Sequence, residues 1–180
     1  MNIKLLHIGL GKTGSTTLQK EIFPEVSSHC NIKFFNQDID HKKKSFSILE
    51  NEWNFEKKLS NNFIFSNENL FSYDWEFVKV EKNFNLIKRN FSKDTIILLV
   101  LRNPSDLLNS IYTQRISQME INSPEKFFFV SEDTNLELNL NRYNLNNFDY
   151  NKIINLYQSY FNNVFVIKYE NLQKLKFLKE

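Results

Sequence analysis

Short apolar runs alternate with longer segments of helical periodicity along the chain. The clearest runs are 3–8, 95–101 and 164–167. Runs of this length are typical of strands that are buried on both faces of a parallel sheet. Between them, apolar side chains recur every three or four positions, which is typical of amphipathic helices. The alternation predicts an α/β fold, a three-layer sandwich with a central, mainly parallel sheet.

The same pattern predicts the individual elements. The expected strands are 3–8, 31–36, the start of 63–70, 95–101 and 164–168. The expected helices are 15–22, 46–59, 75–91, one that begins at 104, and 150–161. Pro24 should close the first helix, because proline has no N–H to donate. We expect 95–101 to be the central strand and 164–168 to be buried. Residues 113–147 lack a clear period, which is typical of a functional loop or of weakly marked helices.

All three glycines of the protein lie between the first strand and the first helix, at positions 9, 11 and 14. Glycine lets main-chain N–H groups turn inward without a Cβ clash, and the start of the following helix adds unpaired donors. Lys12 adds a full positive charge. The stretch therefore predicts a cradle for phosphate-like oxygens, and the alternative is an ordinary turn with a solvated lysine. The residues expected to bind the anion are Lys12, Thr13, Gly14, Ser15, Thr16 and Thr17.

A carboxylate follows the strand that begins at residue 63. Ligands of parallel sheets bind at the carboxyl ends of the strands, so Glu68 should lie near the glycine loop if the two strands are neighbours. In that position it could act as a general base. The alternative is a structural glutamate in the first turn of a helix from Leu70 onward.

An arginine leaves the end of the strand 95–101. Asn103 can cap the following helix, with Pro104 at its first position, and Ser110 lies about two turns into that helix. The guanidinium fork of Arg102 and a nearby hydroxyl suit a terminal phosphate. Taken alone, Arg102 could equally be a structural arginine in an ion pair.

Together these segments resemble the sulfotransferases that use 3′-phosphoadenosine-5′-phosphosulfate (PAPS). Residues 12–19 are similar to the 5′-phosphosulfate loop, which usually reads Pro-Lys-Thr-Gly-Thr-Thr, with Gly11 in the place of the proline. Residues 102–110 are similar to the 3′-phosphate site, and 63–70 to the Ser-x-Glu strand end of carbohydrate-type members. Residues 148–172 look like the closing helix and strand. The Tyr-Glu-x-Leu end there is a structural signature, so Glu170 is left out of the site.

The resemblance implies a fold of the P-loop nucleotide-binding type and a sulfotransferase activity. A sulfuryl group would pass from PAPS to a hydroxyl or amine of an acceptor, favouring a carbohydrate or glycolipid, and no metal is expected. Lys12 and Glu68 would be the catalytic residues, and Glu68 would take the acceptor proton. The donor would be bound by Lys12, Thr13, Gly14, Ser15, Thr16, Thr17, Arg102 and Ser110.

Two other functions stay open. A P-loop kinase would use Lys12 with ATP and magnesium, but its loop pattern requires a glycine where Leu6 stands. Its magnesium also needs an aspartate at an apolar strand end, where this chain has Arg102, so Glu68 is the carboxylate that would have to serve instead. The second alternative is a non-catalytic nucleotide-binding or interaction relative. The sequence stops soon after Leu172, so the single domain over 1–180 could lack C-terminal elements of the family.

Composition limits the partners, the metal sites and the cellular location that we expect. The net charge of +2 comes from 23 basic and 21 acidic residues, so nucleic acid is not implied as a partner. The single cysteine, Cys30, excludes an intrachain disulfide and a multi-cysteine metal site. The three histidines, at 7, 29 and 41, have no metal-ligand spacing. Since no apolar run reaches membrane-spanning length and no leader precedes the first strand, we expect a soluble, cytoplasmic protein.

Overall fold

Five parallel strands form the centre of the computed structural model, which describes residues 2–36, 61–71, 77–117, 123–130 and 143–176. The strand order is β2-β3-β1-β4-β7. The strands are β1 (Lys4–Ile8), β2 (Lys33–Asn36), β3 (Phe63–Asn67), β4 (Ile96–Leu101) and β7 (Asn163–Lys168). All four pairings are parallel, so the carboxyl ends of the strands share one edge.

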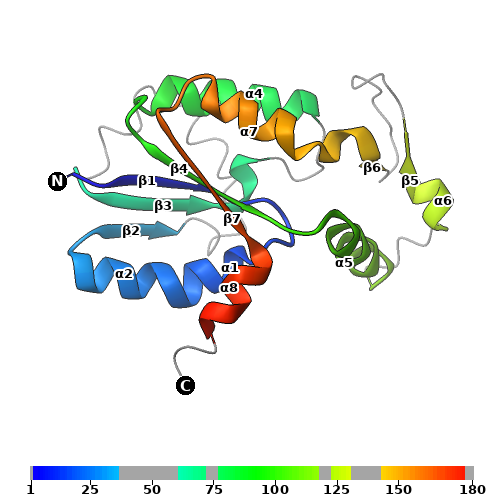
Figure 1. The fold of residues 1–180 in the computed structure, drawn as a ribbon, viewed down its shortest axis with the longest axis horizontal. Coiled ribbons are helices and arrows are strands. Elements are labelled where there is room, and N and C mark those ends of the chain that lie inside the picture. The colour runs from blue at the N-terminus through cyan, green and yellow to red at the C-terminus, as the bar shows by residue number, and fades with distance from the viewer. Residues whose placement is uncertain (1, 37–60, 72–76, 118–122, 131–142, 177–180) are drawn as a thin grey trace.

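Helices cover both faces of this sheet, which confirms the predicted three-layer α/β fold (Figure 1). One face carries α4 (Phe77–Asn90) and α7 (Tyr150–Gln158). The other face carries α1 (Ser15–Thr17), the π-helix Leu18–Ile22, α2 (Phe23–Cys30) and α8 (Tyr169–Lys176). Among the described residues, no helix is both long enough and apolar enough to span a membrane.

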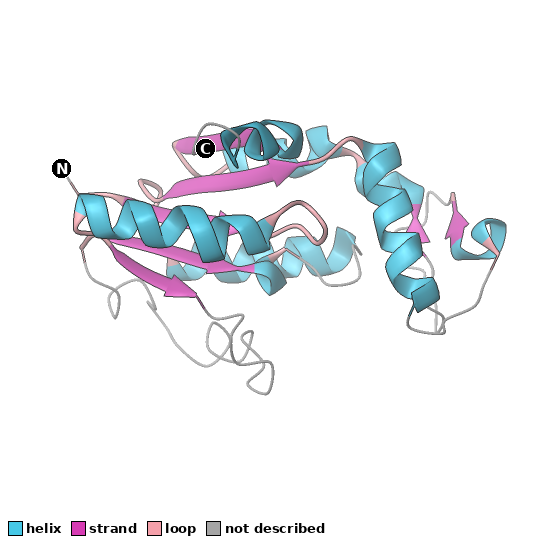
Figure 2. Cartoon of the chain, turned by 90° about the horizontal axis from the view of Figure 1, so that it is seen from below, coloured by secondary structure: helices cyan, strands magenta, loops and turns pink. Residues whose placement is uncertain are grey.

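A smaller lobe extends beyond the carboxyl edge of the sheet (Figures 1 and 2). It contains α5 (Pro104–Ser117), α6 (Pro124–Phe127), β5 (Phe128–Phe129) and β6 (Tyr143–Asn144). Two short 3₁₀ turns, Glu68–Leu70 and Leu145–Phe148, link elements at this edge. These elements account for the described part of residues 113–147, where the sequence showed no clear period. An aromatic cluster joins β5 and β6 to α5, through rings such as Tyr112, Phe127 and Tyr143.

The amphipathic helices bury the residues that their spacing predicts. On α4, Val80, Phe84 and Ile87 are each at most 5% exposed. Helix α7 begins at the cap Asp149, whose carboxylate accepts hydrogen bonds from the N–H groups of Asn151 (3.0 Å) and Lys152 (3.4 Å). Both α4 and α7 pack into one core with the sheet face that they cover. The expected strand at 31–36 is also confirmed, as β2.

Three expectations about the elements are wrong. The central strand is β1, not β4, because β4 pairs with β1 on one side and with the edge strand β7 on the other. Strand β7 is not fully buried: Phe165 is 56% exposed and Val166 41%, since β4 is its only neighbour among the described strands. The first helix also continues beyond Pro24 to Cys30.

A π-turn explains how the helix passes the proline. The N–H of Phe23 donates to the carbonyl of Leu18, five residues back, instead of four. Pro24 then occupies one of the first two positions of α2, where a missing N–H costs little. The position of Pro24 was evident in the sequence, but the π-turn at Leu18–Ile22 that accommodates it was not predicted. The helix expected over 46–59 lies outside the described residues.

Candidate functional site

The loop between β1 and α1 is shaped by two glycines. A Cβ on Gly9 would lie 2.5 Å from the Cα of Glu68, so a side chain at this position would displace backbone. Gly14 has a φ of +87°, and a Cβ there would lie 2.7 Å from the ring of Tyr169. Lys12 adopts a φ of 66°, a left-handed conformation that is uncommon outside glycine. These constraints fix the path of the loop before any ligand binds.

The hydroxyls of the loop have different environments. Thr13 is buried, and its hydroxyl donates to the carbonyl of Leu10 (2.6 Å), so it stabilises the turn itself. Ser15 is 3% exposed, and its Oγ has no hydrogen-bond partner in the described part of the chain. Thr16 is exposed and Thr17 half-buried at the start of α1. Since the first N–H groups of a helix lack intrahelical acceptors, this end of the loop offers donors together with the Ser15 hydroxyl.

Arg102 is held at the end of β4 by contacts on several sides. Its Nη1 donates to the carbonyl of Lys12 (3.2 Å), and its own carbonyl accepts a hydrogen bond from the Tyr150 hydroxyl (2.7 Å). Its guanidinium carbon lies 4.8 Å from the centroid of the Tyr169 ring. Its Nε is buried and has no partner among the described residues. The side chain is therefore positioned beside the glycine loop with its Nε donor unused.

Asn103 and Glu170 fix the turn that follows Arg102. The side-chain oxygen of Asn103 caps α5 by accepting from the N–H of Ser105 (3.0 Å), as its spacing predicts. The N–H of Asn103 donates to the carboxylate of Glu170 (3.1 Å). This hydrogen bond is the main reason why the pKa of Glu170 is lowered. Glu170 thus supports the turn at Arg102, which agrees with a structural role.

Tyr169 is the residue that the sequence reasoning missed. Its ring packs against Gly14 and also lies under the guanidinium of Arg102, so it joins the two halves of the candidate site. The available signal was its position directly after β7, at the same sheet edge as the loop and Arg102. The distance in sequence between Gly14 and Tyr169 hid the contact.

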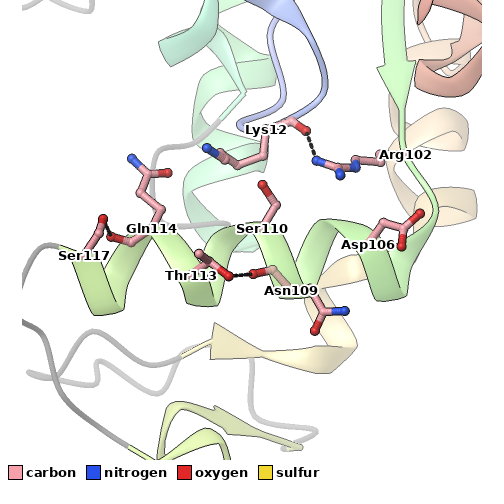
Figure 3. A pocket seen from close by; sticks show the side chains of 8 residues that line it. All are labelled: Lys12, Arg102, Asp106, Asn109, Ser110, Thr113, Gln114 and Ser117. Atoms are coloured by element: carbon pink, nitrogen blue, oxygen red, sulfur yellow. Dashed lines mark hydrogen bonds between the residues drawn. The ribbon is translucent and has the colours of Figure 1, made fainter.

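A cavity of about 520 Å³ lies between the glycine loop and α5 (Figure 3). It is lined by Lys12, Arg102, Asp106, Asn109, Ser110, Thr113, Gln114 and Ser117. Arg102 and Asp106 form one end, Gln114 and Ser117 the other, and Lys12 lies above Ser110 between them. The structure therefore brings the predicted residues Lys12, Arg102 and Ser110 to one cavity, with Arg102 and Asp106 at one end and the Lys12 ammonium directed toward Gln114.

Glu68 is placed differently. It begins the 3₁₀ turn after β3 and packs against Gly9 at the base of the loop, where it is half-buried. Its strand is a direct neighbour of β1, as the sequence reasoning required. It is not one of the residues that line the described cavity. Its role as a base stays a prediction.

A buried polar cluster lies beneath the loop. Nδ1 of His7 hydrogen-bonds the Ser66 hydroxyl (2.8 Å), which also accepts from the side-chain amide of Gln19 (3.1 Å). The cluster joins β1 and β3 to the π-turn after the loop. Complete burial lowers the pKa of His7 to about 3, and its ring meets the edge of Phe23 at a centroid distance of 5.5 Å. His7 is therefore a neutral structural histidine.

The chain is similar in fold to a solved protein, the sulfotransferase from Alicyclobacillus acidocaldarius. The TM-score is 0.57 and the sequence identity 14%, and the match covers 97% of this chain and 76% of that one. No family model and no curated protein matches the sequence. At this level of identity the similarity shows a shared architecture, an α/β fold with a parallel sheet.

Proposed function

We propose that this chain is a sulfotransferase that uses PAPS as donor and a hydroxyl or amine as acceptor, with a carbohydrate or glycolipid as the acceptor molecule. The observation that carries the proposal is the cavity in which Lys12, Arg102 and Ser110 converge. Two buried polar atoms nearby, Ser15 Oγ and Arg102 Nε, have no partner in the described structure. Buried polar atoms without partners are costly, and anionic oxygens would satisfy both.

The residues present fit the two ends of PAPS. The amides at the start of α1, Ser15 and Lys12 would hold the 5′-phosphosulfate, as helix N-termini commonly hold phosphate groups. The guanidinium of Arg102 and the hydroxyl of Ser110 would hold the 3′-phosphate. The 3′-phosphate distinguishes PAPS from ATP, so these two residues would provide the selection for the donor. The shared fold with a known sulfotransferase supports the same proposal.

The chemistry requires a charge stabiliser and a proton acceptor. In the transfer, an acceptor oxygen forms a bond to sulfur while the bond between sulfur and the bridging phosphate oxygen breaks. The electron pair of that bond leaves with adenosine 3′,5′-bisphosphate, where Lys12 would stabilise the growing negative charge. The proton of the acceptor hydroxyl would go to the Glu68 carboxylate.

The proposal is tested by calorimetric titration with adenosine 3′,5′-bisphosphate and with ADP, with and without magnesium. We expect the wild-type protein to prefer the bisphosphate, and Arg102→Ala to bind it about 10- to 100-fold more weakly, because a charge-assisted pair is lost. Arg102→Lys keeps the charge but loses the fork, so it should recover only part of the affinity. Lys152→Ala, exposed on α7, is the surface control. Preference for ADP with magnesium would instead support a kinase.

The assignment of the base is tested separately, by Glu68→Gln. We expect kcat for sulfuryl transfer to fall by about 10²-fold, the usual contribution of a general base, with bisphosphate affinity unchanged. Glutamine keeps the size of the side chain against Gly9, so the loop should retain its path. An unchanged kcat would remove Glu68 from the mechanism and leave the donor site unaffected.

A further inference from the structure

We propose that Tyr150 and Glu170 are positioning residues for Arg102. Together they clamp the peptide bond that follows this arginine, and the clamp sets the place from which its guanidinium binds a terminal phosphate. The inference deepens the proposed sulfotransferase function and rests on it, because Arg102 is the residue that would recognise the 3′-phosphate of the donor. It assigns part of the selection for that phosphate to two residues that do not line the described cavity.

Both polar groups of one peptide unit are held by side chains. The carbonyl of Arg102 accepts a hydrogen bond from the Tyr150 hydroxyl (2.7 Å). The N–H of Asn103, in the same peptide unit, donates to the carboxylate of Glu170 (3.1 Å). Because a trans peptide unit is planar, its carbonyl and N–H point in opposite directions, so the two partners approach from opposite sides. Holding both groups therefore fixes the plane of the peptide and the direction in which the chain leaves β4.

The two partners come from elements on opposite faces of the sheet (Figure 1). Tyr150 is the first residue of α7, on the face that α4 also covers, and Glu170 lies in the first turn of α8, on the other face. The clamped peptide lies between β4, which ends at Leu101, and α5, which begins at Pro104. Since the strand ends before this peptide and the helix begins after it, side chains take the role that main-chain partners have in regular structure.

The clamp acts on Arg102 because the guanidinium is held as well. Nη1 donates to the carbonyl of Lys12 (3.2 Å), and the centroid of the Tyr169 ring lies 4.8 Å from the guanidinium carbon. With the main chain fixed at one end and the guanidinium at the other, few rotamers remain, while the buried Nε has no partner in the described part of the chain. An arginine that is ordered in advance loses little conformational entropy when an anion binds, so it binds a phosphate more tightly. Release of the peptide would remove this advantage.

The first test follows Arg102 in the absence of any ligand. In heteronuclear NMR spectra, its Nε–H signal is identified as the one that is missing in Arg102→Lys. We expect exchange of this proton with solvent to be about 10-fold faster in Tyr150→Phe and in Glu170→Ala, because the buried Nε becomes accessible when the peptide is released. The matched controls are Tyr160→Phe, half-buried beyond the end of α7, and Glu81→Ala, exposed on α4. An unchanged exchange rate in both clamp variants would overturn the inference.

The second test measures selectivity, by calorimetry with adenosine 3′,5′-bisphosphate and with ADP, which lacks the 3′-phosphate. We expect Tyr150→Phe and Glu170→Ala to bind the bisphosphate about 5-fold more weakly, the effect of one lost hydrogen bond, and to bind ADP unchanged. Glu170→Gln should recover most of the affinity, because its amide oxygen can still accept from the N–H of Asn103. Tyr150→Phe removes a single hydroxyl, so it decides the test if Glu170→Ala does not fold. Equal losses for both nucleotides would show a general effect on the fold and contradict the inference.

A double-mutant cycle then links the clamp to Arg102. In the Arg102→Ala background, neither Tyr150→Phe nor Glu170→Ala should weaken binding of the bisphosphate further, because the clamp has no guanidinium left to position. Additive losses would refute a positioning role. If the wild type binds no bisphosphate, or prefers ADP, the proposed function fails instead, and the exchange rate of the Arg102 Nε–H still decides whether the clamp positions the arginine.

Discussion

Lys12→Ala is expected to lower kcat for sulfuryl transfer by about 10²- to 10³-fold, the effect usually seen when one preorganised stabiliser of transition-state charge is removed. The ammonium group is exposed at the cavity between Arg102 and Gln114, so it can reach the oxygen on which charge develops. Binding of adenosine 3′,5′-bisphosphate should weaken much less than kcat falls. Single-turnover transfer from PAPS to an accepted sugar measures the first effect, and calorimetry the second.

Two companion variants separate charge from loop geometry. Lys12 has a φ of 66°, so alanine at this position carries backbone strain as well as the loss of the amine. Lys12→Asn removes the amine but tolerates the left-handed conformation, and it should lose activity to the same extent. Lys20→Ala removes an exposed lysine of the π-helix and should remain fully active. Normal transfer by Lys12→Asn would refute the proposed mechanism.

The strands, the glycine loop and the start of α5 could be predicted because each is marked by a local signal. The apolar run before Arg102 marks a strand, Asn103 and Pro104 mark a helix start, and the three clustered glycines mark a loop. Such patterns depend on neighbours within a few residues, so they can be recognised without knowledge of the tertiary contacts. The structure then places Arg102 beside Lys12, which is a contact that parallel pairing of β1 and β4 enforces.

The order of the strands and the contacts between residues far apart in sequence could not be predicted in this way. The longest apolar run became β4, but β1 is central because the chain returns to pair a strand on each side of it. Apolar β7 is exposed because of its place at the edge of the described sheet, which its residues do not encode. Tyr169 contacts Gly14 from more than 150 positions away, and Gln114 reaches the cavity only through the orientation of α5.

The pH dependence of stability should carry a large contribution from His7, whose pKa falls from 6.5 to about 3 on burial. Above pH 6.5 the imidazole is neutral in both the folded and the unfolded state, so it adds no slope. Below pH 6.5 the unfolded state binds a proton that the folded state refuses until about pH 3. The free energy of unfolding should therefore fall by about 1.4 kcal/mol per pH unit, or roughly 3 kcal/mol between pH 6.5 and pH 4.

Chemical denaturation of the wild type and of His7→Gln across this pH range measures that contribution. Glutamine cannot be protonated, so the variant should lose the share of the slope that His7 provides, whatever its stability at neutral pH. His29→Gln, at an exposed position of α2, is the control substitution. Equal slopes for wild type and His7→Gln would mean that His7 accepts a proton in the folded state. Ser66 links His7 to Gln19 behind the glycine loop, so that proton would also disturb the proposed donor site. Denaturation and calorimetric binding of the bisphosphate, measured over the same pH range, would show the two effects together.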